Sequence, residues 1–142
     1  MKQFPIEPIA RAVIVHRGRI LLCQIRGKRY FFLPGGHMNF RETAARALER
    51  ELKEELIVEP KTAVPIGVVQ NFFERSGRRY HELYFVYRVT LQRYDIVGQE
   101  DHITFHWKSV SQLKTLNLEP KVLRHELPRW LKYRKFFFVT ER

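Results

Sequence analysis

Residues 36–58 read GHMNFRETAARALERELKEELIV, a stretch that combines a glycine, a helical hydrophobic pattern and many glutamates. Thr43 is a residue type that caps the start of a helix, and Pro60 prevents much continuation beyond the end. The sequence therefore predicts a helix over about residues 43–56. At about 100° per residue, one side of this helix carries an apolar stripe, formed by Ala45, Leu48, Leu52 and Leu56.

Three glutamates, Glu51, Glu54 and Glu55, share one arc of the predicted helix beside the apolar stripe. Like charges three or four residues apart repel one another, and partial burial makes the repulsion worse. A divalent cation would remove this repulsion, and oxygen ligands favour Mg²⁺, with Mn²⁺ as an alternative. A solvated acidic face with Lys and Arg neighbours explains the helix alone equally well.

The segment before the helix, LPGGH at residues 33–37, follows a short aromatic strand that we expect over residues 30–33. Glycines let backbone amides come close to a ligand. The segment is therefore a candidate ligand-binding loop, although an ordinary tight turn has the same composition.

Taken together, residues 36–58 resemble the Nudix box, whose pattern is G-x5-E-x7-R-E-U-x-E-E-x-G-U, with U an aliphatic residue. Eight of its nine specified positions agree, namely Gly36, Glu42, Arg50, Glu51, Leu52, Glu54, Glu55 and Val58. This resemblance to the Nudix hydrolase family implies an α/β/α sandwich with a mixed β-sheet between helices.

One position departs from the pattern, because Ile57 stands where the family has a second glycine. In the family this glycine follows the helix, where a residue in the left-handed conformation is common. A β-branched residue resists that conformation. We therefore expect the chain to leave the helix differently here, while the metal ligands, which precede Ile57, are retained.

The resemblance also implies an activity, that of a Mg²⁺-dependent pyrophosphohydrolase acting on a nucleoside diphosphate linked to another group. By position, Glu51, Glu54 and Glu55 would bind the metal and serve catalysis. Arg50 and Glu42 would form a pair that orients the loop and the helix. No covalent nucleophile is required, and a carboxylate would position and deprotonate the attacking water.

Further site residues are expected outside the helix. The backbone around Gly35 and Gly36 would present polar groups to metal or phosphate. A later loop often supplies another catalytic acid in this family, and Glu100 is our candidate, with Asp101 next. Either acid could equally be an ordinary polar loop residue.

Substrate recognition is less specific in the sequence. Arg26 and Arg29 flank a basic turn and are candidates to bind phosphates, or they are simply solvated. His37, beside the glycines, could contact phosphate or cap the loop. Glu82, at the start of a predicted strand, is a candidate extra ligand.

The remaining pattern predicts an α+β domain in which a mixed sheet has a helix on each side. A hairpin is expected from strands at 9–15 and 20–25, and two long strands at 63–74 and 80–91. A strand at 103–108, a short helix at 111–116 and a final helix at 119–133, bent or split at Pro128, complete the prediction. Residues 130–138 mix basic and aromatic side chains, which suits a nucleic-acid or homodimer surface, or simple packing.

The length and composition of the chain limit the classes of protein to which it can belong. The 142 residues are enough for one domain, expected to span 1–142. The single cysteine, Cys23, excludes an intrachain disulfide and fits a cytoplasmic protein. The chain has no apolar run near the ~20 residues that span a bilayer, and residues 1–7 do not resemble a signal peptide.

The formal net charge of +11 favours anionic partners. We expect a small nucleotide as substrate, either a nucleotide sugar such as ADP-ribose or a nucleoside triphosphate. Two alternatives stay open: hydrolysis at the 5′ end of RNA, and a non-catalytic module that binds nucleotide or RNA. The clustered carboxylates argue against pure binding.

Overall fold

The computed structural model describes residues 5–98 and 101–142, which form two sheets, two α-helices and one 3-10 turn. The elements are β1 (Ile6–Val13), β2 (Val15–His16), β3 (Arg19–Ile25), β4 (Gly35–His37), α1 (Ala44–Leu56), β5 (Pro60–Arg75), β6 (Arg78–Leu91), β7 (Ile103–Ser109), the 3-10 turn (Val110–Gln112), α2 (Leu123–Tyr133) and β8 (Phe137–Glu141). The strand orders are β4-β1-β6-β5-β8 and β2-β3-β7.

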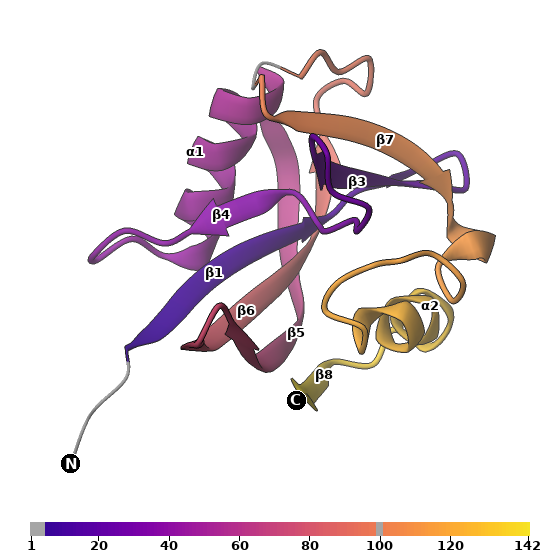
Figure 1. The fold of residues 1–142 in the computed structure, drawn as a ribbon. Coiled ribbons are helices and arrows are strands. Elements are labelled where there is room, and N and C mark those ends of the chain that lie inside the picture. Colours follow the sequence, from indigo (N-terminus) through magenta and orange to yellow (C-terminus); the bar gives the residue numbers. More distant parts are fainter. Residues whose placement is uncertain (1–4, 99–100) are drawn as a thin grey trace.

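The five-stranded sheet is mixed, as the sequence predicted. Strand β1 runs parallel to β6 and antiparallel to β4, while β5 is antiparallel to β6 and parallel to β8. Figure 1 shows α1 and α2 on opposite sides of the strands. One core joins Ala10 and Ala12 of β1 to α1, and the other joins Ile9 and Val13 to α2. The predicted sandwich is confirmed.

Helix α1 begins and ends where the sequence predicted. The hydroxyl oxygen of Thr43 accepts a hydrogen bond from the backbone N–H of Arg46 at 3.2 Å, which caps the first turn. Leu48, Leu52 and Leu56 are fully buried against the sheet. Ala45, predicted in the same stripe, is exposed, and Ala44 and Ala47 are buried in its place. Burial of the three leucines with these alanines fixes the rotation of the helix and therefore the direction of its glutamates.

The expected unusual exit from α1 is wrong. Ile57 takes the left-handed conformation, with φ 51° and ψ 45°, and its N–H bonds to the carbonyl of Lys53 at 3.1 Å. The guanidinium of Arg93 donates to the carbonyl of Ile57 at 2.9 Å. These bonds satisfy polar groups at the helix end, and the half-exposed Ile57 side chain has room in this conformation.

The N-terminal hairpin differs from the prediction. Strand β1 lies in the five-stranded sheet, and only the short β2 forms a hairpin with β3, through Val15↔Ile20 and His16↔Arg19. The reason is burial on both faces: Ile9 and Ala10, which point to opposite faces, are both fully buried. A strand of this kind belongs in the centre of a sheet.

Smaller differences concern short segments. The predicted strand at 30–33 is reduced to single bridges, Phe31 with Leu118 and Phe32 with Cys23. The predicted short helix at 111–116 is the 3-10 turn, and α2 begins at Leu123 with Pro128 inside it. The long strands β5 and β6 and strand β7 confirm the prediction, with slightly different ends.

Candidate active site

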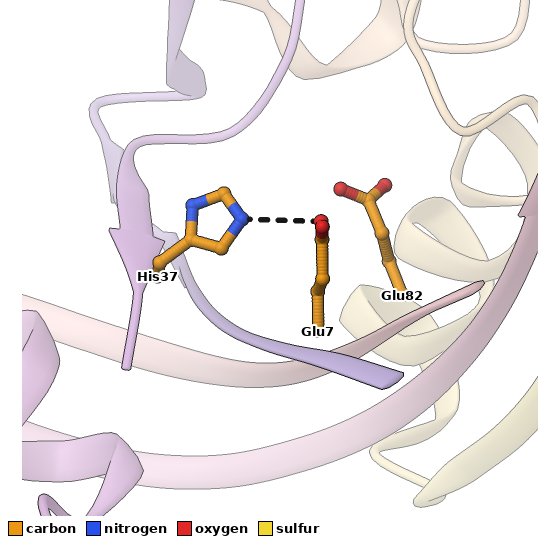
Figure 2. Close-up of side chains that lie close together, drawn as sticks. All are labelled: Glu7, His37 and Glu82. Atoms are coloured by element: carbon orange, nitrogen blue, oxygen red, sulfur yellow. Dashed lines mark hydrogen bonds and ion pairs between the residues drawn. The ribbon is translucent and has the colours of Figure 1, made fainter. Parts of the chain in front are cut away.

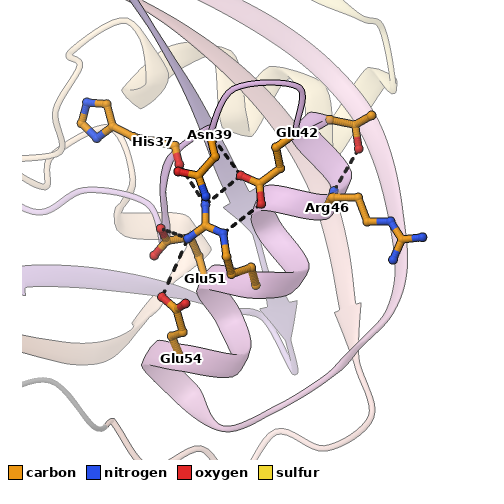
Figure 3. A network of polar contacts seen from close by, with 8 residues as sticks. His37, Asn39, Glu42, Arg46, Glu51 and Glu54 are labelled. Carbon is orange, nitrogen blue, oxygen red and sulfur yellow. Dashed lines mark hydrogen bonds and ion pairs between the residues drawn. The ribbon is translucent and has the colours of Figure 1, made fainter.

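A polar network joins α1 to the segment that precedes it (Figure 3), and Arg50, in the middle of α1, makes most of its contacts. Its Nε and Nη2 donate to the two carboxylate oxygens of Glu42, at 2.9 and 2.8 Å. Nη2 also donates to the carbonyl of His37 at 3.1 Å, and Nη1 donates to Glu51 at 2.8 Å. The planar guanidinium group suits this bidentate contact with the Glu42 carboxylate. One guanidinium thus joins the loop, β4 and the helix.

Arg50 and the carboxylates that it contacts stabilise each other's charged forms. Hydrogen bonds from Arg50 and from the backbone N–H of Asn39 lower the pKa of Glu42 from 4.5 to about 2. Hydrogen bonding to Glu42, followed by Glu51, raises the pKa of Arg50 above its usual value. The pair therefore stays ionised over the whole range in which an enzyme works.

The predicted glycine loop is in fact strand β4, paired with β1 through Ala10↔Gly36 and Arg11↔Gly35. Because glycine has no side chain, other groups of the protein lie very close to both Gly35 and Gly36. A Cβ at Gly36 would lie 2.6 Å from Oε1 of Glu51, and a Cβ at Gly35 would lie 2.0 Å from the carbonyl oxygen of Ala10. Gly36 therefore makes room for a carboxylate, and the loop form was predicted wrongly because LPGG also reads as a turn.

The three helical glutamates differ in environment. The side chain of Glu54 is 58% exposed and that of Glu51 is 16% exposed, while Glu55 is buried. Nη1 of Arg50 lies 3.8 Å from Glu54 and 2.8 Å from Glu51, between the two carboxylates. No three oxygens, one from each glutamate, lie within 4.8 Å of one another. In this structure the guanidinium supplies the positive charge beside them.

The residues predicted to bind phosphate lie apart from this network. Arg26 donates through Nε to the carbonyl of Asp101, and Arg29 is exposed in the same turn region. The side chain of His37 bonds to Glu7 at 3.4 Å, while its carbonyl reaches Arg50. Glu100 lies outside the described residues.

Two features were not predicted. The first is a pocket of about 360 Å³ that Arg26 and Asp101 share with Leu21, Ile96, Gly98, Ile103, Thr104, Phe105 and Trp107. The second is the grouping of Glu7 and His37 with Glu82. Both join segments distant in the sequence, so only knowledge of the strand register could have revealed them; the box pattern carries no such signal.

The NUDIX domain profile matches residues 7–131, and the chain belongs to this family. The match indicates a pyrophosphohydrolase. No curated protein sequence matches the chain. In the described residues no helix is long and apolar enough to cross a membrane.

Solved structures share the fold at low sequence identity. A mutator MutT protein from Bacillus halodurans has a TM-score of 0.80 and 18% identity, covering 94% of this chain and 88% of its own. A MutT NUDIX hydrolase from Burkholderia pseudomallei has a TM-score of 0.72 and 23% identity, covering 87% and 98%. A UDP-X diphosphatase has a TM-score of 0.61 and 19% identity, covering 97% and 69%.

Proposed function

We propose that this chain is a Mg²⁺-dependent hydrolase that cleaves a nucleoside diphosphate derivative into a nucleoside monophosphate and a phosphorylated remainder. The observation that carries the proposal is the network in which Arg50 joins Glu42, Glu51 and the carbonyl of His37. It holds the acidic face of α1 against β4, and a buried ion pair is weak evidence for a purely stabilising role.

The donor set fits a hard divalent cation. Glu51, Glu54 and Glu55 offer carboxylate oxygens on one helix face, and Gly36 leaves the space that the Glu51 carboxylate occupies. Bound Mg²⁺ would neutralise the diphosphate and lower the pKa of a coordinated water. Binding requires the Glu51 and Glu54 carboxylates to turn from Arg50 toward a common point.

The residues of the chain then have separate tasks. Arg50 and Glu42 fix β4 relative to α1, and Glu55, being buried, gives a carboxylate of restricted motion. One carboxylate of the set accepts a proton from the attacking water as its oxygen bonds to phosphorus. The bond between the attacked phosphorus and the bridging oxygen of the phosphoanhydride breaks, and the second phosphate leaves with the bridging oxygen.

The pocket beside Arg26 supports an aromatic, anionic substrate. It combines the guanidinium of Arg26 and the carboxylate of Asp101 with the rings of Phe105 and Trp107, so the rings suit a base and Arg26 suits a phosphate beside it. The candidates are a nucleotide sugar such as ADP-ribose and a nucleoside triphosphate. We place the enzyme in the cytoplasm, and a homodimer through residues 130–138 stays a prediction.

Hydrolysis of a nucleotide panel with Mg²⁺, with and without chelator, tests the proposal. We expect turnover that chelation abolishes, and a loss of at least about a hundredfold in kcat in Glu54→Gln and in Glu55→Gln. Glu49→Gln is the matched control, because Glu49 lies on the same helix but pairs with Lys53 and Arg46. Activity that survives chelation would reject the metal requirement, and full activity in both variants would reject the ligand assignment.

A second candidate is hydrolysis at the 5′ end of RNA, favoured by the net charge of +11. An RNA substrate releases many counterions on binding, so its affinity should fall steeply with salt. A small nucleotide should show a shallow dependence. The salt slope of KM for a triphosphorylated oligonucleotide and for a free nucleotide decides between the two.

A further inference from the structure

Three side chains that commonly bind metals meet on the face of the sheet opposite α1 (Figure 2). Glu7 comes from β1, His37 from β4 and Glu82 from β6, which are neighbouring strands. The register places Glu7 beside Glu82 and Ile9 beside His37. One ligand atom from each residue lies within 4.8 Å of the other two.

This group is separate from the carboxylates of α1. Successive side chains of a strand point to opposite faces. Gly36 faces the carboxylate of Glu51, so His37 points to the other side of the sheet. Ile9, the partner of His37 in the register, packs in the core that contains α2.

One carboxylate oxygen of Glu82, Oε2, is open to a ligand. The residue is more than nine-tenths buried, and its Oε1 accepts hydrogen bonds from Asn71 at 3.2 Å and from the hydroxyl of Tyr84 at 3.0 Å. Oε2 accepts none from the residues that the structure describes, and no Lys or Arg nitrogen among them lies within 4.0 Å of this carboxylate. A buried carboxylate is costly unless a cation or donor compensates it.

Arg11 is the cation packed on a neighbour of Glu82, with its guanidinium 5.3 Å from the centre of the Tyr84 ring, and no ion pair among the described residues joins it to the Glu82 carboxylate. Burial, as the largest cause, raises the pKa of Tyr84 to about 12, so its hydroxyl stays a neutral donor. The nearest cationic contact in the group is from Arg78 to Glu7, at 3.9 Å, between partly exposed side chains. Such a contact contributes little. The other oxygen of Glu7 lies 3.4 Å from Nε2 of His37.

We propose that Glu7, His37 and Glu82 form a second metal site, which binds a divalent transition-metal ion, with Zn²⁺ as the expected ion. Three atoms within 4.8 Å of one another share a point no more than about 2.8 Å from each. Zinc bonds to nitrogen and carboxylate oxygen are about 2.0–2.2 Å, so each ligand moves inward by less than about 1 Å. The imidazole favours Zn²⁺ over Mg²⁺, and water completes the four ligands.

An ion at this site would fix β4 from the face opposite Arg50. The carbonyl of His37 accepts from Arg50, and its side chain belongs to the proposed site. Bound Zn²⁺ therefore ties the three residues of β4 to β1 and β6 without taking part in the chemistry at α1.

Zinc binding to the full chain tests the site by isothermal titration calorimetry with ZnCl₂. The background carries Glu54→Gln and Glu55→Gln, and excess Mg²⁺ is present, so that the helical carboxylates compete less for zinc. We expect one Zn²⁺ per chain and a loss of affinity of at least about tenfold when His37→Ala or Glu82→Gln is added. His125→Ala, which removes an exposed histidine of α2, is the matched control and should change nothing.

Two measurements distinguish a loss of zinc binding from misfolding of the variant, and neither depends on enzymatic activity. Circular dichroism checks each variant, and Glu82→Gln keeps an oxygen that can accept from Asn71 and Tyr84. In wild-type protein, Zn²⁺ should shift the imidazole ¹⁵N resonances that disappear in His37→Ala. The proposal is overturned by the absence of zinc uptake, by equal affinity in His37→Ala, or by shifts confined to other histidines. No substrate is present, so the result is separate from the hydrolysis test.

Discussion

Replacing Gly36 by alanine adds a methyl group where the Glu51 carboxylate lies. The new Cβ would be 2.6 Å from Oε1 and 2.7 Å from the carboxyl carbon, against an ordinary contact of at least 3.4 Å. An ordinary contact requires the carboxylate to move by about 0.8 Å, and because its Oε1 also accepts from Arg50 at 2.8 Å, the movement disturbs that hydrogen bond. Overpacking of this kind costs about 1–3 kcal/mol in the free energy of unfolding. Misplacement of a site group by about 1 Å costs about a hundredfold in rate.

The assay is a double-mutant cycle measured by urea unfolding, together with kcat/KM. In a Glu51→Ala background the methyl group meets no carboxylate, so Gly36→Ala should then change stability by less than about 0.5 kcal/mol. An equal loss of stability in both backgrounds would refute the reasoning, because the cost would then come from the β4 backbone and not from Glu51.

Two further predictions concern the ends of α1. The pKa of Glu42 is about 2 in the folded chain and near 4.5 when unfolded, so its stabilisation is complete above about pH 4.5 and is lost as the pH falls toward 2. Acid unfolding monitored by circular dichroism should therefore be steeper in wild-type protein than in Glu42→Gln, and parallel curves would contradict this. Ile57→Gly should raise the free energy of unfolding by about 0.5–1 kcal/mol, because glycine takes φ 51° without strain and the lost side chain is half exposed. A lower melting temperature in that variant would show that the Ile57 side chain contributes more than its conformation costs.

Local sequence signals predicted the parts of the fold that depend on local physics. Thr43 caps α1 and the apolar stripe sets its rotation, so the helix and its acidic arc follow from spacing alone. The strand predicted at 80–91 is β6, in which Tyr84 and Val86 lie in one core while Phe85 and Tyr87 pack against the other. Such patterns need no knowledge of distant residues.

The rest depends on pairing between distant segments. Strand β4 was missed because its glycines gain a strand conformation only by pairing with β1, and Ile57 was misjudged because Arg93, distant in sequence, satisfies its carbonyl. The contact between Gly36 and Glu51 explains that box glycine better than the expected ligand-binding loop does. The register of β1, β4 and β6 also decides that Glu7 and His37 lie close to Glu82.

The pairing of β4 with β1 decides which residues of β4 face α1 and which face the opposite side of the sheet. A strand shifted by one residue exchanges its two faces. A shift of β4 by one residue against β1 would turn the imidazole of His37 toward the carboxylate of Glu51 and place a glycine beside Glu7. A designer who grafts this segment onto another scaffold would therefore have to keep the register of β4, whereas the loop at residues 38–43 lies beyond the strand.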